Sequence, residues 1–174
     1  MLWIATDNGL SRYIPSEDKF FNIQTTPYAD SIVENDISEL LVATRSGRLW
    51  YTTETEPGIN CLSVEFDSES KNPPPANHFE HDPIDEKSIA DNNITDFIED
   101  SAGHIWIGTG QNGISFLSFV KSKFTHHRYD QENEWGLKSD KIYSITTMTD
   151  GMMWAATGFG LSLIHISEPT RHNA

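Results

Sequence analysis

The 174-residue sequence lacks the features of several large classes of protein. It has a single cysteine, Cys61, which has no partner for an internal disulfide and too few companions for a zinc site. No stretch approaches the roughly 20 apolar residues of a membrane span, and the first residues do not form a signal peptide. Basic residues are scarce, 12 against 26 acidic ones, which gives a formal net charge of −14. Such a charge repels nucleic acid and anionic lipid, so we expect neither as a partner.

What the sequence does contain is a repeat. Four tryptophans, separated by 47, 56 and 48 residues, each open the phrase W-x-x-T, and a glycine followed by Leu or Ile comes six to eight residues later. Because the tryptophans occupy the same place in every copy, we expect them to pack between repeats rather than to bind a ligand. The repeat residues are Trp3, Trp50, Trp106, Trp154, Gly9, Gly58, Gly113 and Gly160.

Each full copy of the repeat predicts four short strands. In the clearest copy these are 94–99, 104–109, 113–118 and 124–130, with tight loops between them. Four strands in a period of 40 to 50 residues are typical of a β-propeller blade. We therefore predict an all-β partial β-propeller of about four antiparallel blades over residues 1–160, with almost no helix and with the two end blades partial. The units are placed near residues 1–30, 31–81, 82–130 and 131–160.

The stretch "GTGQNG" matches the dinucleotide fingerprint G-x-G-x-x-G at Gly108, Gly110 and Gly113. That fingerprint needs a helix after the glycines, whereas "GISFLSF" predicts a strand. Gly113 is explained as the repeat glycine, and the first two positions hold other small or polar residues in the other copies, so we expect no special need for glycine there. We predict no cofactor.

The segment "NNITDFIEDSAGHIWIGTGQNGISFL" resembles the two-component regulator propeller repeat, and the linkers "HDPIDEKSIADNNITDF" and "YDQENEWGLKSDKIYSI" resemble the linkers of that family. The resemblance covers residues 2 to about 160, and the unit at 37–66 departs most because its turn lacks the aspartate. The resemblance implies a hybrid sensor with two periplasmic propellers, a small β-sandwich, a membrane helix, and kinase and response-regulator parts. Many such sensors detect oligosaccharides. None of the phosphorelay parts lies in this chain.

The resemblance leads us to expect a non-catalytic, periplasmic sensor fragment, with an oligosaccharide as ligand and the remaining blades of a parent protein as partners. The parent would carry histidine kinase activity outside this chain. Two alternatives remain: a protein-interaction scaffold, or a propeller lyase or glycosidase. Catalysis needs ionisable groups that converge on the channel, and the predicted innermost strands "ITDFIE" and "IYSITT" carry few.

The tail over residues 161–174 raises a separate question. "LSLIHISEPTR" at 161–171 resembles the in-frame translation of a transposase sequencing adapter. We therefore expect the natural sequence to end near Gly160 and no further blade strand to follow it. On this interpretation His165 and His172 carry no functional information.

Trp135 is the candidate ligand-binding residue, because it lies outside the repeat phrase in a polar linker. Exposed aromatic rings in loops stack on sugars; the alternative is that the ring packs against the neighbouring blade. The histidines do not predict a metal site: His126 and His127 alternate along a strand, and the pair in "HFEH", His78 and His81, lies in loop and strand rather than in a helix. We predict no catalytic or metal site.

Two further expectations concern surfaces. In a propeller blade the loop from second to third strand and the linker to the next blade open on the same face. That face should gather residues 53–58, 82–92, 110–112 and 130–140, with the proline-rich loop 67–77 on the opposite face. Because neighbouring blades stabilise one another, we also expect the isolated chain to be marginally stable and to associate.

Overall fold

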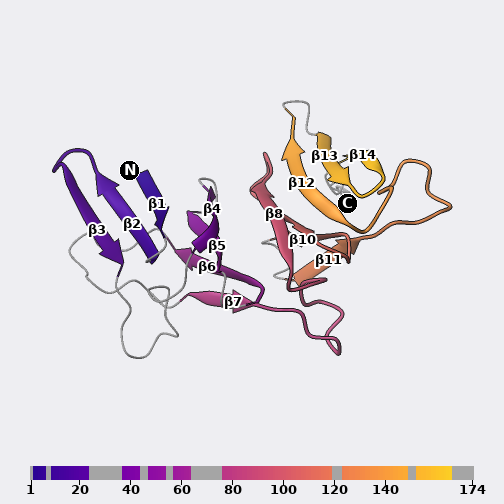
Figure 1. Cartoon of the computed structure of the whole chain (residues 1–174), viewed down its shortest axis with the longest axis horizontal. Helices are drawn as coiled ribbons and strands as arrows, with labels where there is room; N and C mark the ends of the chain where they lie inside the picture. The colour runs from indigo at the N-terminus through magenta and orange to yellow at the C-terminus, as the bar shows by residue number, and fades with distance from the viewer. Residues whose placement is uncertain are drawn as a thin grey trace, which may run out of the picture. The chain divides into compact units, whose positions relative to one another are not determined.

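The computed structural model of the chain consists of strands, turns and loops (Figure 1). It describes residues 2–6, 9–23, 37–43, 47–53, 57–63, 76–118, 123–148 and 152–165. Across those ranges we find no helix, and therefore none whose length and hydropathy would let it cross a membrane. The chain divides into two compact units, residues 1–92 and 93–174.

The first unit contains two antiparallel sheets in which strands adjacent in sequence are adjacent in space. The first sheet has three strands: β1 (Leu2–Thr6), β2 (Gly9–Ile14) and β3 (Lys19–Ile23). The second sheet has four: β4 (Ile37–Ala43), β5 (Arg48–Thr53), β6 (Ile59–Ser63) and β7 (Asn77–Phe79). Short connections between most of these strands favour this order, because an antiparallel neighbour can be reached through a tight turn; the connection from β6 to β7 is longer.

The second unit repeats the arrangement. Its first sheet has four strands: β8 (Ile94–Glu99), β9 (Ile105–Thr109), β10 (Ile114–Ser118) and β11 (Lys123–His127). Its second sheet has three: β12 (Ile142–Thr147), β13 (Met152–Thr157) and β14 (Gly160–His165). Every pairing is antiparallel. The prediction of an all-β partial propeller with about four blades is confirmed.

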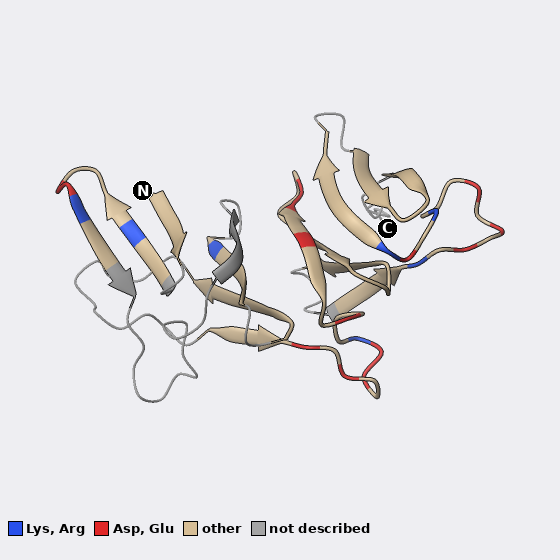
Figure 2. Ribbon diagram, viewed as in Figure 1, with Lys and Arg blue, Asp and Glu red and all other residues tan. Residues whose placement is uncertain are grey.

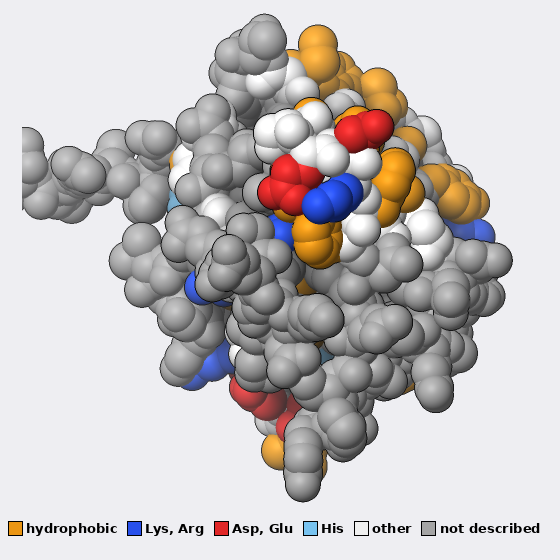
Figure 3. All heavy atoms as spheres, turned by 90° about the vertical axis from the view of Figure 1, so that its left-hand side faces the viewer, with side chains coloured by type: hydrophobic (Ala, Val, Ile, Leu, Met, Phe, Trp, Pro, Cys, Tyr) orange, Lys and Arg blue, Asp and Glu red, His pale blue; other side chains and the backbone are white. Residues whose placement is uncertain are grey.

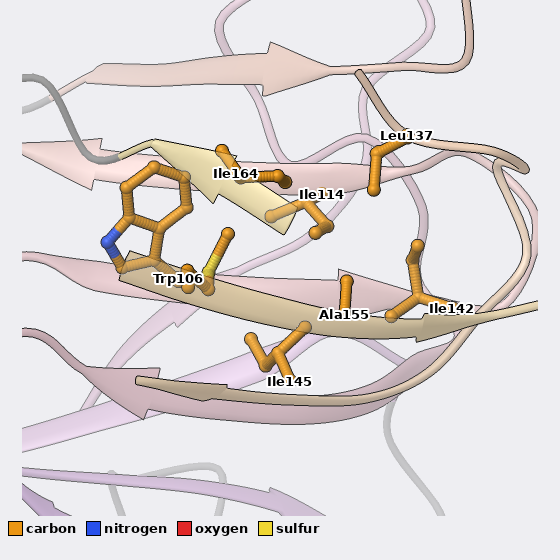
Figure 4. Packing of buried hydrophobic residues seen from close by; sticks show 8 residues of the cluster. Trp106, Ile114, Leu137, Ile142, Ile145, Ala155 and Ile164 are labelled. Atoms are coloured by element: carbon orange, nitrogen blue, oxygen red, sulfur yellow. The ribbon is translucent and has the colours of Figure 1, made fainter. Parts of the chain in front are cut away.

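Large apolar side chains fill the space between the two sheets of each unit. In the second unit, Trp106 and Ile114 of one sheet share a buried cluster with Ile145, Met153 and Ile164 of the other (Figure 4). Strand β9 is buried along its whole length, which explains its continuous apolar sequence "IWIGT". The equivalent cluster of the first unit consists of Trp3, Leu10, Leu49, Tyr51 and Leu62.

Strands β4, β8 and β12 each begin a blade, and each carries a β-bulge at the same place. The register shifts between Ile37 and Glu39 in β4, between Ile94 and Asp96 in β8, and between Ile142 and Ser144 in β12. In the second unit the carboxylate of Asp96 accepts hydrogen bonds from the hydroxyl of Ser144 and the backbone N–H of Ile145, each at 2.7 Å. These bonds fix β8 beside β12.

The structure corrects the expectation that no blade strand follows Gly160. Strand β14 extends to His165 and pairs with β13 over six residues. Its sequence "GLSLIH" has the same order of apolar and polar residues as "GISFLS" in β10, so it fills the third-strand position with Ser162 and Ile164 buried. The origin of this tail stays a prediction, and His172 lies outside the described residues.

A second correction concerns Gly108, which was expected to have no special need for glycine. A Cβ atom added at this position would lie 2.8 Å from Cγ2 of Ile142, whose side chain is fully buried. The close approach of the two blades therefore restricts this position. The strand that follows Gly113 confirms the predicted strand, so "GTGQNG" lacks the helix that the dinucleotide fingerprint requires.

Candidate functional site

Two linkers with the same hydrogen-bond pattern precede β8 and β12. In the first, residues 81–92, the carboxylate of Asp82 accepts a bond from the N–H of Ile84 at 2.9 Å. The carboxylate of Asp85 accepts a bond from the N–H of Lys87 at 3.0 Å. These are Asx turns, in which a short polar side chain replaces a backbone partner. Lys87 therefore lies on a defined turn.

The second linker, residues 129–140, repeats both turns. The carboxylate of Asp130 accepts a bond from the N–H of Glu132 at 2.9 Å. The side-chain oxygen of Asn133 accepts a bond from the N–H of Trp135 at 3.1 Å. Trp135 thus occupies the position that Lys87 occupies in the first linker, on a backbone held by the same bonds.

Each linker is closed at its ends by one further bond. The N–H of His81 donates to the side-chain oxygen of Asn92, and the N–H of Tyr129 donates to that of Asp140, each at 2.6 Å. One large apolar side chain near the end of each linker is buried and anchors the linker to the sheets. These anchors are Ile89 and Leu137.

The repeat glycine joins each linker to the preceding blade. The N–H of Gly58 donates to the carbonyl of Asn92 at 3.1 Å, and the N–H of Gly113 donates to the carbonyl of Asp140 at 2.8 Å. Both glycines have a positive φ, +91° and +79°, and an added Cβ would overlap the carbonyl that ends the fourth strand. The loop at 110–112 and the linker thus lie on one side of their unit, as expected. Residues 54–56 and 67–75 of the face prediction lie outside the described residues.

Trp135 is 80% exposed. It does not take the alternative of packing against the next blade, because the sheet β12–β14 that follows it is present and leaves the ring in solvent. Its linker is nevertheless ordered by hydrogen bonds and by the buried anchor Leu137. Because the loop is already ordered, it would lose little conformational entropy when a ligand binds to the exposed indole, and this favours a binding surface.

The repeat tryptophans have the opposite environment. Trp3, Trp50 and Trp106 are buried, and Trp154 is partly buried. Ring contacts connect Trp50 to Phe79 and Trp106 to Phe116, with centroids 5.7 and 4.5 Å apart. Rings that are enclosed in this way stabilise the blades and offer no stacking surface to a ligand.

Sequence reasoning missed the most exposed aromatic residue among the described ones. Phe159, at the two-residue turn between β13 and β14, is 85% exposed. It follows the W-x-x-T phrase in a position that holds Gln111 in the preceding blade. A phenyl ring in place of an amide at this turn could have marked Phe159 as a candidate from the sequence alone.

The histidines contact different partners. Nδ1 of His78 lies 3.0 Å from the side-chain oxygen of Asn60, whereas Nδ1 of His81 lies 2.8 Å from the carbonyl of Ile89. In the next blade, His126 lies 3.2 Å from the hydroxyl of Ser115. Among the described residues we find no group of three or more side chains suited to hold a metal ion.

His127 packs against Trp106 with ring centroids 5.3 Å apart. Although much of the residue remains exposed, this contact withdraws water from the ring, and partial burial therefore holds the pKa of His127 below its ordinary value. The neighbouring His126 lowers the pKa further by charge repulsion. The effect is a consequence of packing around the repeat tryptophan.

Burial raises the pKa of the Cys61 thiol, and the guanidinium of Arg48 opposes that rise only in part. The thiol is 2% exposed, so it cannot act on a dissolved substrate. Cys61 therefore offers no accessible nucleophile at the described surface.

Comparisons with known proteins bear on the same segments. Residues 88–111 match the family model described as "Two component regulator propeller". The match begins in the first linker and runs through β8 and β9 to the loop that follows. No curated protein matches the sequence.

Solved structures with a similar fold cover nearly the whole chain. The extracellular domain of the putative hybrid two component system BT3049 from B. thetaiotaomicron has a TM-score of 0.67 and 22% identity, over 96% of this chain and 23% of that one. The corresponding domain of BT4673 from the same organism has a TM-score of 0.62 and 23% identity, over 92% of this chain and 19% of that one. An auxiliary nutrient binding protein from Bacteroides thetaiotaomicron VPI-5482 has a TM-score of 0.53 and 9% identity, over 86% of this chain and 40% of that one.

At these identities the likeness establishes the fold. The chain spans about a fifth of the length of the two hybrid-system domains, 23% and 19%. Propeller sensor domains of two-component regulators are generally non-catalytic. The described blades thus match a small part of a much larger propeller assembly.

Proposed function

We propose that this chain, which carries the two component regulator propeller repeat at residues 88–111, is part of the sensor of a hybrid two-component system and binds an oligosaccharide through the linker 129–140. The observation that carries the proposal is the indole of Trp135, which is 80% exposed on a linker whose backbone is fixed by hydrogen bonds. Function is thereby assigned to a particular surface rather than to the fold, which hosts many functions.

The chemistry of the linker suits a sugar. An aromatic face attracts the C–H groups on one side of a pyranose ring, and nearby polar groups bind its hydroxyls. Asp130, Glu132 and Glu134 are exposed beside Trp135, and their oxygens accept hydrogen bonds from hydroxyl groups. The fold likeness to a nutrient binding protein is compatible with a soluble nutrient as the signal.

The structural relatives support a proposal for the wider role. Two of them are described as extracellular domains of hybrid two component systems, which supports our assignment of this chain to the periplasmic side of an inner-membrane sensor. The remaining blades, the membrane helix and the histidine kinase would lie in the rest of a parent protein. Determining the complete open reading frame tests this assignment, and a reading frame without a membrane segment and kinase would contradict it.

The ligand proposal is tested with Trp135→Ala in the full chain. Binding to an array of plant, fungal and bacterial oligosaccharides should identify a ligand, and titration calorimetry should then show that the substitution weakens binding by about 1–3 kcal/mol, as for the loss of one aromatic contact. Lys87→Ala, at the equivalent position of the first linker, is the matched control. Unchanged affinity in Trp135→Ala would remove the linker from consideration.

A further inference from the structure

Phe159 and Trp135 come from two segments that are bonded to each other. The N–H of Gly158 donates to the carbonyl of Lys141 at 2.8 Å, and the N–H of Lys138 donates to the hydroxyl of Ser162 at 2.9 Å. These two bonds hold the end of the linker against the turn between β13 and β14. Trp135 and Phe159 thus lie on segments that meet at the end of the sheet where β12 begins and β13 ends, an end that can be followed in Figure 1.

The turn that carries Phe159 is itself ordered. The N–H of Phe159 lies 3.3 Å from the hydroxyl of Thr157, which donates to the carbonyl of Gly160 at 2.9 Å. The hydroxyl of Thr109 makes the same bond to the carbonyl of Gly113, at 2.8 Å, in the preceding blade. The threonine of the W-x-x-T phrase therefore fixes the turn, and the residue at its tip is free to vary.

The preceding blade makes the equivalent hydrogen bonds without an aromatic residue at either position. Its linker has Lys87 where the second has Trp135, and its loop has the exposed Gln111 where the turn has Phe159. The same backbone bonds form in both cases. Two exposed rings on segments that are hydrogen-bonded to each other place apolar surface in water, which points to a binding role.

The charge of the linker restricts the ligand. Its outer part, "DQENEW" at 130–135, has three exposed carboxylates and no basic residue (Figure 2). The ammonium of Lys138 is held by the carbonyl of Glu134 at 2.6 Å, and that of Lys141 lies 5.0 Å from the ring centre of Tyr143. An anionic sugar would approach these carboxylates at a cost in free energy, whereas a neutral sugar would not.

We propose that Trp135 and Phe159 form two successive stacking surfaces for one neutral oligosaccharide, which is bound along the end of the sheet β12–β14. This inference rests on the proposed function and extends it, because it adds Phe159, the need for several sugar units and the exclusion of anionic glycans. We therefore expect a disaccharide to contact one ring and a hexasaccharide to contact both.

The test uses the full chain and four variants: Trp135→Ala, Phe159→Ala, the double variant, and Phe20→Ala, which removes an exposed phenylalanine from the other unit. Cellohexaose, mannohexaose and xylohexaose are the neutral probes, hexagalacturonate is the anionic probe, and the corresponding disaccharides test length. Binding is measured by calorimetry and, for weak ligands, by saturation-transfer NMR. The circular dichroism spectrum of every variant is compared with that of the parent chain.

At least one neutral hexasaccharide should bind at least tenfold more tightly than its disaccharide and than hexagalacturonate. Phe159→Ala should lower the hexasaccharide affinity about tenfold and leave the disaccharide affinity within about twofold, while Phe20→Ala changes neither. If Trp135→Ala weakens binding and Phe159→Ala does not, the proposed function stands and this inference is overturned. Equal affinity for hexagalacturonate also overturns it. If no sugar binds, both proposals are overturned, and a protein partner becomes the alternative occupant.

Discussion

The indole N–H of Trp106 donates a 2.8 Å hydrogen bond to the carboxylate of Asp100 at the turn between β8 and β9. The same carboxylate accepts bonds from the N–H groups of Ala102 and His104, each at 2.9 Å. Trp50 is the equivalent tryptophan of the preceding four-stranded blade, and its indole nitrogen is buried without a partner among the described residues. That difference follows the sequence, since "TRSGRLW" lacks the aspartate of "DSAGHIW". One carboxylate therefore connects a turn to the blade core in one repeat and is missing in another.

Removal of this carboxylate should destabilise the second unit. We expect Asp100→Ala to lower the free energy of unfolding by about 2–4 kcal/mol, because it leaves a buried indole N–H and two backbone N–H groups without their acceptor. Urea unfolding followed by tryptophan fluorescence measures the effect. Ser101→Ala, at the exposed neighbouring position, should change the value by less than about 0.5 kcal/mol. A similar loss in both variants would show that the hydrogen bonds contribute little.

Substitution of the repeat glycine by alanine should destabilise the fold more in a blade whose fourth strand covers the glycine. An added Cβ at Gly113 meets the carbonyl of His127, whereas nothing described lies within 4 Å of one added at Gly160. Both have a positive φ, +79° and +110°, so Gly160→Ala should cost about 1–2 kcal/mol from backbone strain alone. Gly113→Ala should cost about 2–4 kcal/mol, because the overlap adds to that strain. Denaturant titration of the two variants compares them, and equal losses would argue against the overlap.

The two linkers should tolerate an exchange of the residues at their equivalent positions, Lys87 and Trp135. Because Lys87 and Trp135 follow the same pair of Asx turns and are both exposed, Lys87→Trp and Trp135→Lys should each change the free energy of unfolding by less than about 0.5 kcal/mol. Thermal and urea unfolding provide the measurement. A loss of more than about 1 kcal/mol in Trp135→Lys would mean that the ring stabilises the fold, and it would weaken the case for a ligand.

The thiol of Cys61 should be unreactive in the folded chain. Its pKa is raised by burial, so iodoacetamide at pH 8 should label the urea-unfolded chain far faster than the native one. The raised pKa stabilises the fold fully below the pKa of the unfolded thiol, about 8.5, and this contribution is lost as the pH rises through the higher folded value. Cys61→Ala should lack this alkaline loss, as unfolding experiments at pH 7, 9 and 10 can show. Native labelling at the unfolded rate would contradict the burial.

The isolated chain should associate through its apolar outer surface. On the side shown in Figure 3, hydrophobic side chains lie among charged ones, and the exposed residues of the first sheet include Leu2 and Phe20, at 55% and 62% exposure. Blades that lack a neighbour expose the sides that stacking would cover. Light scattering during size-exclusion chromatography should show association that increases with concentration and decreases in a Leu2→Ser, Phe20→Ser double variant. A monodisperse monomer with a sharp, cooperative melt would contradict this.

The sequence by itself determined the repeat and hence the fold. Tryptophan, threonine and glycine recur at nearly constant spacing because each has a local role: the ring fills the blade, the hydroxyl closes a turn, and the glycine adopts a positive φ. The strands predicted at 94–99, 104–109, 113–118 and 124–130 correspond to β8–β11 within a few residues. Such properties depend on neighbours within one repeat, so they can be inferred from spacing alone.

Only the tertiary structure decided which residues form a surface and which positions are restricted. Whether the ring of Trp135 is packed or exposed depends on the blade that follows it. Phe159 lies at the same end of the sheet because the N–H of Gly158 donates to the carbonyl of Lys141, 17 residues earlier in the chain. Gly108 is restricted by Ile142 of another sheet, and the tail "LSLIH" becomes a strand because β13 offers it an unpaired edge. Long-range packing and edge pairing arise from atoms that are distant in sequence, and a local pattern does not contain them.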